Sequence, residues 1–384
     1  MCKIAIIGWY GTETIGDRAI LCGILKVISD SFQSFEIQIG ALYPVLTERT
    51  ILEDYSFLKK CIGKDFRISV FDSSKITQLK RAIRWCDILS VGGGPLMDIS
   101  GMLMLDYSFS YAKSLKKKTA LLGCGWGPLK ESRFVSNARK LIRNSDLILM
   151  RDQKSVHQCV ENTSDLLGEK KVKGLIDPAF FAAKVFIENQ KSKERSESII
   201  CINLRDMHYG TSNRCPQILN VNLFLKDIIK EIAEKYKERE VLLVPMHTFS
   251  IGGDDRYILN SIAQSLNIDN ITVQNNPLSL EETMSKYYNA WFCVGMRFHS
   301  IVLQTLLNGK NYILDYTDPL NGKTVSMLQQ LQLQDCYNEH YISLYGNIEK
   351  KLEIDGNIQR KEFPLEAIEI YYDNFVAELS GLIK

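Results

Sequence analysis

Short apolar runs alternate with longer amphipathic stretches along this chain, and that alternation constrains its fold more than any other feature. The apolar runs are nearly continuous in valine, isoleucine and leucine, as strands covered on both faces are. They predict strands at Lys3–Ile7, Glu36–Ala41, Ile68–Phe71, Ile88–Val91, Thr119–Gly123, Leu147–Met150, Ile199–Asn203, Val241–Val244, Ile271–Val273, Trp291–Val294 and Tyr312–Leu314. Helices are predicted between them at Asp17–Ser29, Lys75–Arg84, Leu103–Leu115, Arg133–Asn144, Val221–Tyr236, Asp254–Leu266 and Ser279–Tyr288. Strands that alternate with helices form parallel sheets through right-handed crossovers.

The length of the chain, 384 residues, exceeds one ordinary core and suits two. Residues 188–198 are all polar and mostly charged, which favours an exposed connector over its alternative, a surface loop within one domain. We therefore predict Rossmann-like domains at 1–187 and 199–362, facing a central cleft. The amphipathic stretch Leu365–Leu382 predicts a C-terminal helix, within 363–384, that packs across the domain junction.

Composition narrows the class of protein. Hydrophobic residues make up 45% and charged residues 24%, with a net charge of +2, which is typical of a globular protein with no bulk attraction to nucleic acid. We find no apolar run long enough to span a membrane and no signal peptide pattern. The ten cysteines are scattered singly, without a C-x-x-C pair, as buried thiols in a reducing compartment are. These features predict a cytoplasmic protein without a nucleic-acid partner.

Glycine-rich turns follow three of the predicted strands. In open parallel sheets, ligands bind beyond the carboxyl ends of the strands, and glycine allows tight turns and close approach of a ligand. The turns are Gly8–Asp17, Gly92–Pro95 and Gly123–Pro128, and Asp17 is predicted to cap the first helix, whose N-terminus attracts anions. The residues expected to line the cleft are Gly11, Gly16, Asp17, Gly93, Gly94, Gly125 and Gly127. The alternative is that each turn only joins a strand to a helix.

Cations follow the ends of four other predicted strands and predict a pocket for a highly charged anion. They are Arg151, Arg205, Arg297 and Lys323, and the turn that carries Arg297 continues into His299 and Ser300. Guanidinium groups suit carboxylate and phosphate, and histidine ordinarily titrates near neutrality, so His299 is the candidate for proton transfer. We expect structural roles for the other histidines, which are His157, His208, His247 and His340.

Several known chemistries have no support in the sequence. There is no phosphate-binding P-loop motif, no H-E-x-x-H metal helix and no G-x-S-x-G nucleophile elbow. Acidic residues, among them Asp98, Asp177, Asp254 and Asp255, show no spacing typical of a two-metal site. We predict neither a metal nor a cofactor.

These motifs, in this order, resemble the polysaccharide pyruvyl transferase family from about Ile4 to Leu328. The matching pieces are Gly16-Asp17, Gly92–Gly94, Gly125–Pro128, Arg151-Asp152 with Ser155, Asp177–Ala179, Pro245-Met246 with Asp255, Gly295–Ser300 and Gly322-Lys323. The sequence differs from the family at Thr14, where asparagine is usual, and at Arg18, where an acidic residue is common. Lys323 also lies farther beyond Tyr316 than in the family, so its role and the acceptor side stay open.

The resemblance implies a two-domain GT-B-like fold and a reaction with phosphoenolpyruvate as co-substrate. The family transfers a pyruvyl group onto two hydroxyls of a sugar as a cyclic ketal and releases phosphate. We expect His299 and Arg297 to be catalytic. We expect the donor to be bound by Arg151, Lys323, Arg205 and Ser300. The acceptor would be a sugar of a capsule, exopolysaccharide or cell-wall precursor. A lipid-linked acceptor would bring the protein to the inner face of the membrane, and the oligomeric state is open. The alternatives are a glycosyltransferase that uses a nucleotide-sugar and a non-catalytic sugar-binding relative.

Overall fold

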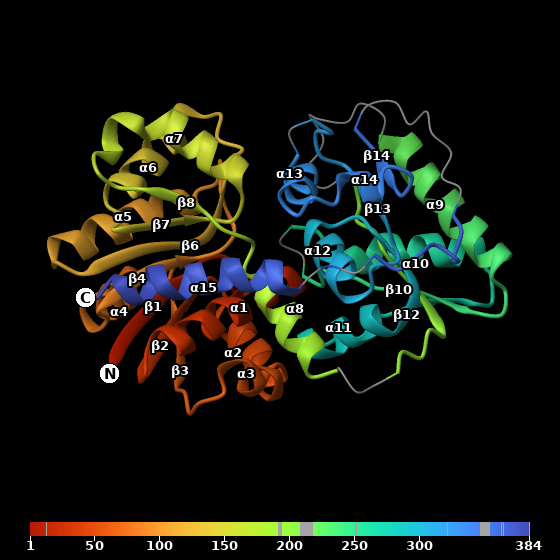
Figure 1. Cartoon of the computed structure of the whole chain (residues 1–384), viewed down its shortest axis with the longest axis horizontal. Coiled ribbons are helices and arrows are strands. Elements are labelled where there is room, and N and C mark those ends of the chain that lie inside the picture. Colours follow the sequence, from red (N-terminus) through yellow and green to blue (C-terminus); the bar gives the residue numbers. More distant parts are fainter. Residues whose placement is uncertain are drawn as a thin grey trace. The chain divides into compact units, whose positions relative to one another are not determined.

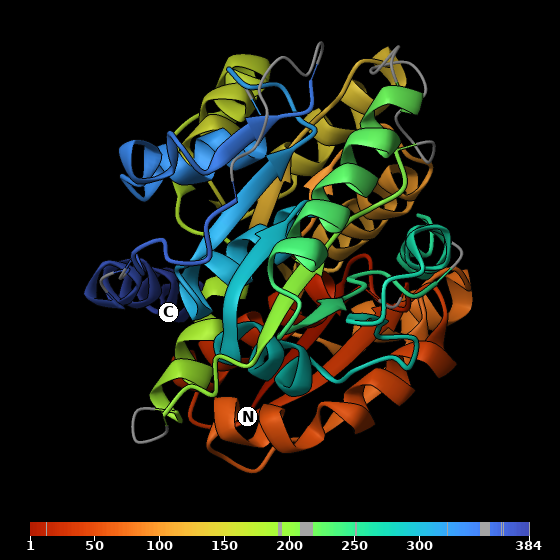
Figure 2. The same cartoon turned by 90° about the vertical axis from the view of Figure 1, so that its right-hand side faces the viewer.

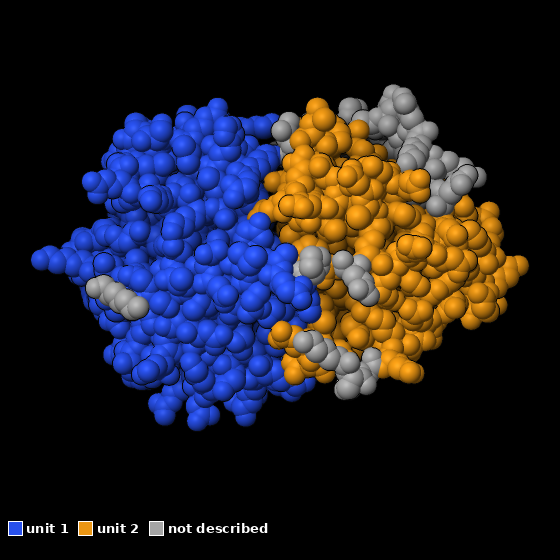
Figure 3. All heavy atoms as spheres, viewed as in Figure 1, with its two compact units in different colours: residues 1–13, 17–185, 364–384 blue, residues 14–16, 186–363 orange. Residues whose placement is uncertain are grey.

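The computed structural model describes residues 1–12, 14–190, 194–207, 218–249, 252–320, 322–345, 354–361, 363 and 365–383 (Figure 1). The chain divides into two compact units, which Figure 3 colours separately. Unit 1 comprises Met1–Glu13, Asp17–Val185 and Pro364–Lys384, and unit 2 comprises Thr14–Gly16 and Phe186–Phe363. One of the places where the chain passes between the units, Val185 to Phe186, lies within the helix at 179–188. Of the predicted connector 188–198, residues 191–193 lie outside the described part.

Unit 1 is built on a parallel sheet in which the strand order is β3-β2-β1-β4-β6-β7-β8, and β5 pairs with β6. The order reverses at β1, whose neighbours β2 and β4 lie on opposite sides. The switch point of unit 1 is therefore the place beyond the carboxyl ends of β1 and β4. The strands are β1 (Cys2–Ile7), β2 (Phe35–Ala41), β3 (Ile68–Asp72), β4 (Ile88–Gly92), β5 (Pro95–Leu96), β6 (Lys118–Trp126), β7 (Leu147–Met150) and β8 (Val172–Gly174).

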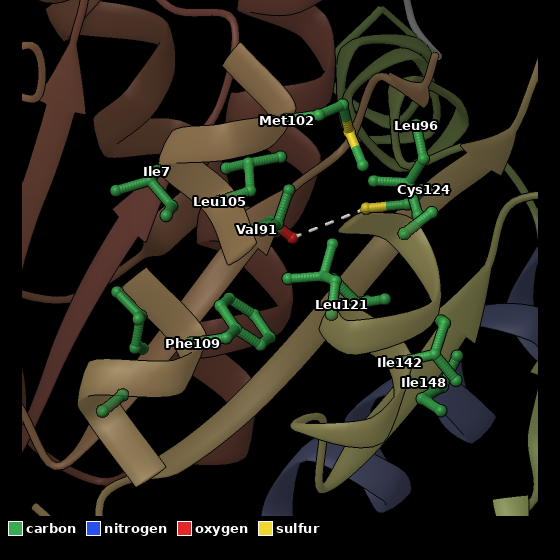
Figure 4. Packing of buried hydrophobic residues seen from close by; sticks show 14 of the residues in the cluster. Ile7, Val91, Leu96, Met102, Leu105, Phe109, Leu121, Cys124, Ile142 and Ile148 are labelled. Atoms are coloured by element: carbon green, nitrogen blue, oxygen red, sulfur yellow. Dashed lines mark hydrogen bonds between the residues drawn. The ribbon is translucent and has the colours of Figure 1, made fainter. Parts of the chain in front are cut away.

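Helices that bury their apolar side chains against this sheet form the core of unit 1. Leu105 and Phe109 pack with Ile7, Val91 and Leu121 in one buried cluster (Figure 4). The C-terminal helix α15 packs within the same unit, because Tyr372 and Phe375 contact Phe181 edge-on. The helices are α1 (Ile15–Ser31), α2 (Pro44–Glu53), α3 (Tyr55–Ile62), α4 (Ile76–Trp85), α5 (Gly101–Ser114), α6 (Ser132–Arg143), α7 (Gln153–Leu167), α8 (Ala179–Glu188) and α15 (Leu365–Gly381).

Unit 2 contains a second parallel sheet, ordered β11-β10-β9-β12-β13-β14. Here the order reverses at β9, so the switch point of unit 2 lies beyond β9 and β12. Helix α9, green in Figure 2, packs Val221, Leu225 and Ile229 onto this sheet. The strands are β9 (Ile199–Asn203), β10 (Glu240–Leu243), β11 (Ile271–Val273), β12 (Ala290–Gly295), β13 (Asn311–Asp315) and β14 (Tyr341–Ser343). The helices are α9 (Ile218–Lys235), α10 (Asp255–Leu266), α11 (Leu280–Asn289), α12 (Phe298–Leu307), α13 (Lys323–Gln330) and α14 (Gln334–Tyr337).

The predicted fold class, two Rossmann-like parallel-sheet domains, is confirmed. Every predicted strand and helix is present. The described residues add the short strands β5, β8 and β14 and the helices α2, α3, α7, α8, α12, α13 and α14. One local prediction is wrong: Asp17 does not cap α1, because the helix already begins at Ile15 and Asp17 lies in its first turn. A carboxylate there still suits the positive end of the helix dipole. Among the described helices, none is long and apolar enough to cross a membrane.

Candidate functional site

The switch point of unit 2 brings together the loops that follow β9 and β12. The backbone N–H of Arg297 donates to Asn203 Oδ1 at 3.1 Å, and the N–H of Arg205 donates to the Met296 sulfur at 3.4 Å. Asn203 is held in turn by a 2.9 Å hydrogen bond to the carbonyl of Val244. Two predicted donor-binding arginines are thus fixed beside one another at the position where open parallel sheets bind ligands.

Arg297 is oriented by a fully buried carboxylate, Asp255. Arg297 Nε donates to the two Asp255 oxygens at 2.9 and 2.8 Å, and Nη2 donates to Oδ1 at 2.6 Å. The same carboxylate accepts the backbone N–H groups of Met246 and His247, both at 3.1 Å. Burial alone lowers the pKa of Arg297, but attraction to Asp255 outweighs burial and raises the pKa. Arg297 is therefore a permanent, directed positive charge.

The Arg297 guanidinium also keeps one nitrogen available to contact an anion. The side chain is 18% exposed, and Nη1 forms no hydrogen bond to any residue that the structure describes. A guanidinium held through Nε and Nη2 can still present Nη1 to an anion.

Tyr316 lies among Arg205, Arg297 and Lys323, which we call the cation cluster. The Arg205 guanidinium carbon is 4.8 Å from the centre of the tyrosine ring. Burial alone raises the pKa of Tyr316, but Lys323, Arg205 and Arg297 outweigh it and lower the pKa to about 8. The shift reports a local excess of positive charge.

Lys323 is the first residue of α13, directly after the N-cap residue Gly322. Lys323 Nζ lies 4.9 Å from the centre of the Phe298 ring. Its position beside a helix N-terminus favours an anion further.

His299 is the second residue of α12 and is partly buried. Its ring packs edge-on against Phe298, with 5.1 Å between ring centres. Gly16, which belongs to unit 2, lies directly against the imidazole, and a Cβ at that position would overlap it. The backbone N–H of Ile15 donates to the carbonyl of Met246 at 3.0 Å and fixes this approach. The absence of a side chain at residue 16 thus leaves room for the His299 ring.

Ser300 has a different place from the one expected of a donor ligand. It is fully buried, and its hydroxyl donates to the carbonyl of Arg297 at 2.7 Å. In this structure Ser300 stabilises the start of α12.

The switch point of unit 1 is filled by aromatic side chains. The Tyr10 hydroxyl donates to the carbonyl of Gly92 at 2.8 Å, and Trp9 lies against Gly94, where a Cβ would overlap the indole. The other predicted glycines of this unit also approach protein atoms: Gly93 lies against Ile20, Gly11 against Tyr43, and Gly127 against the backbone N of Leu129. The close approaches seen here are therefore to neighbouring parts of the protein.

Arg151 belongs to unit 1 and is 8% exposed. Its Nε lies 3.4 Å from Asp152, and its Nη1 lies 3.8 Å from Asp177. A Cβ on Gly125 would stand 2.7 Å from Nη2, so this glycine provides the space that the guanidinium occupies. Arg151 is a buried cation between two carboxylates, unlike the cation cluster of unit 2.

A further hollow of about 730 Å³ lies beside α10. Its polar groups are bonded to one another: Arg256 Nη2 contacts Asp254 at 2.6 Å, and Asn260 Nδ2 donates to Asn275 at 2.6 Å. None of the cation cluster lines it, so this hollow is separate from the cluster at the switch point. No group of three or more histidine, cysteine, aspartate or glutamate side chains in the described part of the chain could hold a metal ion.

The sequence singled out the cations and His299 but missed three residues that organise them. Tyr316 served only as a reference point for Lys323, Asn203 was the last residue of a strand, and Asp255 was one motif position among many. Their positions at strand ends and at a helix start were the available signal. Their contacts with cations arise only from the fold.

Comparison with known proteins identifies a matching family and solved structures with a similar fold. The family described as polysaccharide pyruvyl transferase matches residues 15–319. UDP-GlcNAc 2-epimerase from Methanocaldococcus jannaschii has a similar structure, with a TM-score of 0.56 and 14% identity over 96% of this chain and 98% of that one. The UDP-GlcNAc 2-epimerase from Neisseria meningitidis, bound to UDP-GlcNAc, has a TM-score of 0.54 and 13% identity over 98% and 99%. No curated protein matches the sequence. At such identities, the structural likeness concerns the fold alone.

Proposed function

This chain belongs to the polysaccharide pyruvyl transferase family, and on that premise we propose that it transfers a pyruvyl group from phosphoenolpyruvate to a sugar. The product is a cyclic ketal on two hydroxyls of a surface-polysaccharide precursor, and inorganic phosphate is released. The observation that carries the proposal is the cation cluster around Tyr316 at the switch point of unit 2. A small donor with a carboxylate and a phosphate matches such a concentration of positive charge.

In this proposal the cation cluster holds the two anionic groups of the donor. Arg205 and Arg297 offer planar guanidinium groups, which suit bidentate contacts, and Lys323 offers a point charge at a helix N-terminus. As the bond from carbon to the phosphate oxygen breaks, negative charge builds up on the leaving phosphate. Fixed cations stabilise that charge without reorganising, which is usually a large contribution to catalysis.

His299 supplies the proton transfers. The first sugar hydroxyl adds to the carbon that bears the phosphate, while a proton from the imidazole converts the donor methylene to a methyl group. Departure of phosphate, which takes the bonding electron pair, leaves an oxocarbenium-like carbon. The second hydroxyl adds there and gives up its proton, which completes the ketal. The imidazole, fixed between Phe298 and Gly16, can accept one of the hydroxyl protons and restore its starting state, and the other proton leaves on the released phosphate.

We assign the donor to unit 2 rather than to Arg151. Asp152 and Asp177 already lie against the Arg151 guanidinium, so an added anion would have to compete with two carboxylates. The acceptor is proposed to be a sugar of a polysaccharide precursor, carried on a lipid or free.

Incubation with phosphoenolpyruvate and a panel of lipid-linked and nitrophenyl glycosides tests the proposal. We expect one acceptor to gain the mass of a pyruvyl ketal while an equal amount of phosphate is released. Transfer from a nucleotide-sugar, with release of a nucleotide and no need for phosphoenolpyruvate, would instead identify a glycosyltransferase. Acceptor binding without any turnover would identify a sugar-binding protein.

A further inference from the structure

Tyr316 lies at the centre of the cation cluster, and the proposed reaction gives it no role. It follows β13, the strand next to β12, so it lies at the same edge of the sheet as Arg297. The Arg205 guanidinium lies over its ring at 4.8 Å, and Lys323, 4.9 Å from the Phe298 ring, follows in the chain after Tyr316. Loops from three strands therefore surround one phenol.

The surroundings of this phenol differ from those of the buried tyrosines. Burial raises the pKa of Tyr10, Tyr287 and Tyr337, whereas the cations lower that of Tyr316 to about 8. An ordinary phenol titrates near pH 10. The cluster therefore draws Tyr316 towards its negatively charged form.

Two carboxylates lie near the cluster, and each has hydrogen-bond donors of its own. Asp255 is bound to Arg297 and to two backbone N–H groups. Asp315 accepts hydrogen bonds from the backbone and hydroxyl of Thr317 and from the Tyr341 hydroxyl, and burial raises its pKa. Asp255 is therefore matched to Arg297, and burial favours the neutral form of Asp315.

We propose that Tyr316 is a proton-coupled binding residue, whose phenol donates a hydrogen bond to the bound anion and must keep its proton while that anion is present. The identity of the anion, phosphoenolpyruvate, rests on the proposed function. A tyrosinate and the donor compete for the same cations, so only one of them can be accommodated at full charge. The donor phosphate loses its last proton near pH 6 and stays fully charged above it.

The sign of the effect follows from this competition. Below about pH 8 the phenol is neutral and the donor binds with full affinity. Above that pH, Tyr316 must take up a proton before the donor can bind, so the affinity falls about tenfold per pH unit. Bound donor neutralises the cations and raises the pKa of Tyr316 in return, because the coupling is reciprocal.

The first test measures tyrosinate absorbance against pH in the full-length protein. We expect a step of one tyrosine near pH 8 in the wild type, retained in Tyr257→Phe and missing in Tyr316→Phe. Tyr257 is 79% exposed on α10 and makes a matched control. The pKa of Lys361 is also about 8, but an amine does not contribute to this absorbance. Identical curves for the wild type and Tyr316→Phe would overturn the proposal.

The second test adds phosphoenolpyruvate and follows both the absorbance step and the affinity by calorimetry. We expect the step to move to higher pH, and the affinity to fall above about pH 8 in the wild type but not in Tyr316→Phe. Binding that leaves the step in place would overturn the proposal. If phosphoenolpyruvate does not bind at all, the proposed donor is wrong, and inorganic phosphate then serves as the probe. A step that phosphate moves supports the role of Tyr316, and one that it leaves in place contradicts it.

Discussion

The two units share a strand order around their switch points but place different side chains there. In unit 1, Trp9 and Tyr10 pack against the glycines that follow β1 and β4. In unit 2, Arg205 and Arg297 follow β9 and β12 and lie beside a phenol. The comparison shows that the same topology can place aromatic side chains at one switch point and cations at the other.

Arginine is used differently in the two units as well. Arg151 lies between Asp152 and Asp177, and it is 8% exposed. Among the described residues, Arg297 forms an ion pair with one carboxylate, that of Asp255, and its side chain is 18% exposed. The positive charge of Arg151 is matched locally, whereas that of Arg297 adds to the charges of Arg205 and Lys323. This difference makes unit 2 the binding unit in our account.

Replacement of His299 should have the largest effect. His299→Gln keeps a hydrogen-bonding side chain but cannot transfer a proton near neutral pH, so we expect turnover to fall by about a hundredfold to ten-thousandfold. Phosphate release that depends on acceptor measures it, with circular dichroism as the folding control. His157→Gln, an exposed position on α7, should turn over normally. Near-normal turnover of a folded His299→Gln protein would contradict the role of His299 in proton transfer. The cation cluster alone would then have to account for catalysis.

Gly16→Ala should have the next largest effect, because the new Cβ would displace the His299 ring. A misplacement of about 1 Å can lower turnover by roughly a hundredfold. Gly381→Ala is the matched control, since nothing lies within 4 Å of a Cβ there. Steady-state kinetics on both variants should show a loss of turnover for Gly16→Ala only. Equal activities would mean that the position of the imidazole does not matter to the reaction.

Replacement of Arg151 should have the smallest effect on chemistry and should act on stability. Arg151→Met leaves Asp177, a buried carboxylate, without its cation, which we expect to lower the free energy of unfolding by about 1–3 kcal/mol. Urea unfolding measures that loss, and Arg133→Met, whose side chain is 67% exposed in the wild type, serves as the control. If Arg151→Met stayed fully stable but lost affinity for phosphoenolpyruvate, the distinction between the units would fail.

Most of the fold could be predicted from the sequence because its strands are covered on both faces and therefore read as continuous apolar runs. Elements without such a signal were missed. Helix α8, Ala179–Glu188, is largely apolar and lacks a clear polar face. Strands β8 and β14 contain three residues each, too few for a recognisable pattern.

The candidate site could be predicted only in part. The rule that ligands bind at strand ends located Arg205, Arg297 and His299, which the fold does place in one unit. The same rule grouped Arg151 with them, because nothing in the sequence shows that Asp177 lies beside it. Tyr316 was missed because only the fold shows that three cations from separate loops lie around its phenol. These roles depend on contacts between residues far apart in the chain, and patterns in a single sequence do not show such contacts.

The most direct test of the account is calorimetric titration of phosphoenolpyruvate into the wild type, Arg205→Met, Lys323→Met and Arg151→Met at pH 7. Loss of one hydrogen bond between charged groups costs about 1.5–3 kcal/mol, so we expect affinity to fall about tenfold to a hundredfold in each unit 2 variant. Arg151→Met, measured where it is folded, should bind like the wild type. Wild-type affinity in Arg205→Met and Lys323→Met, with loss in Arg151→Met, would contradict the assignment of the donor to unit 2.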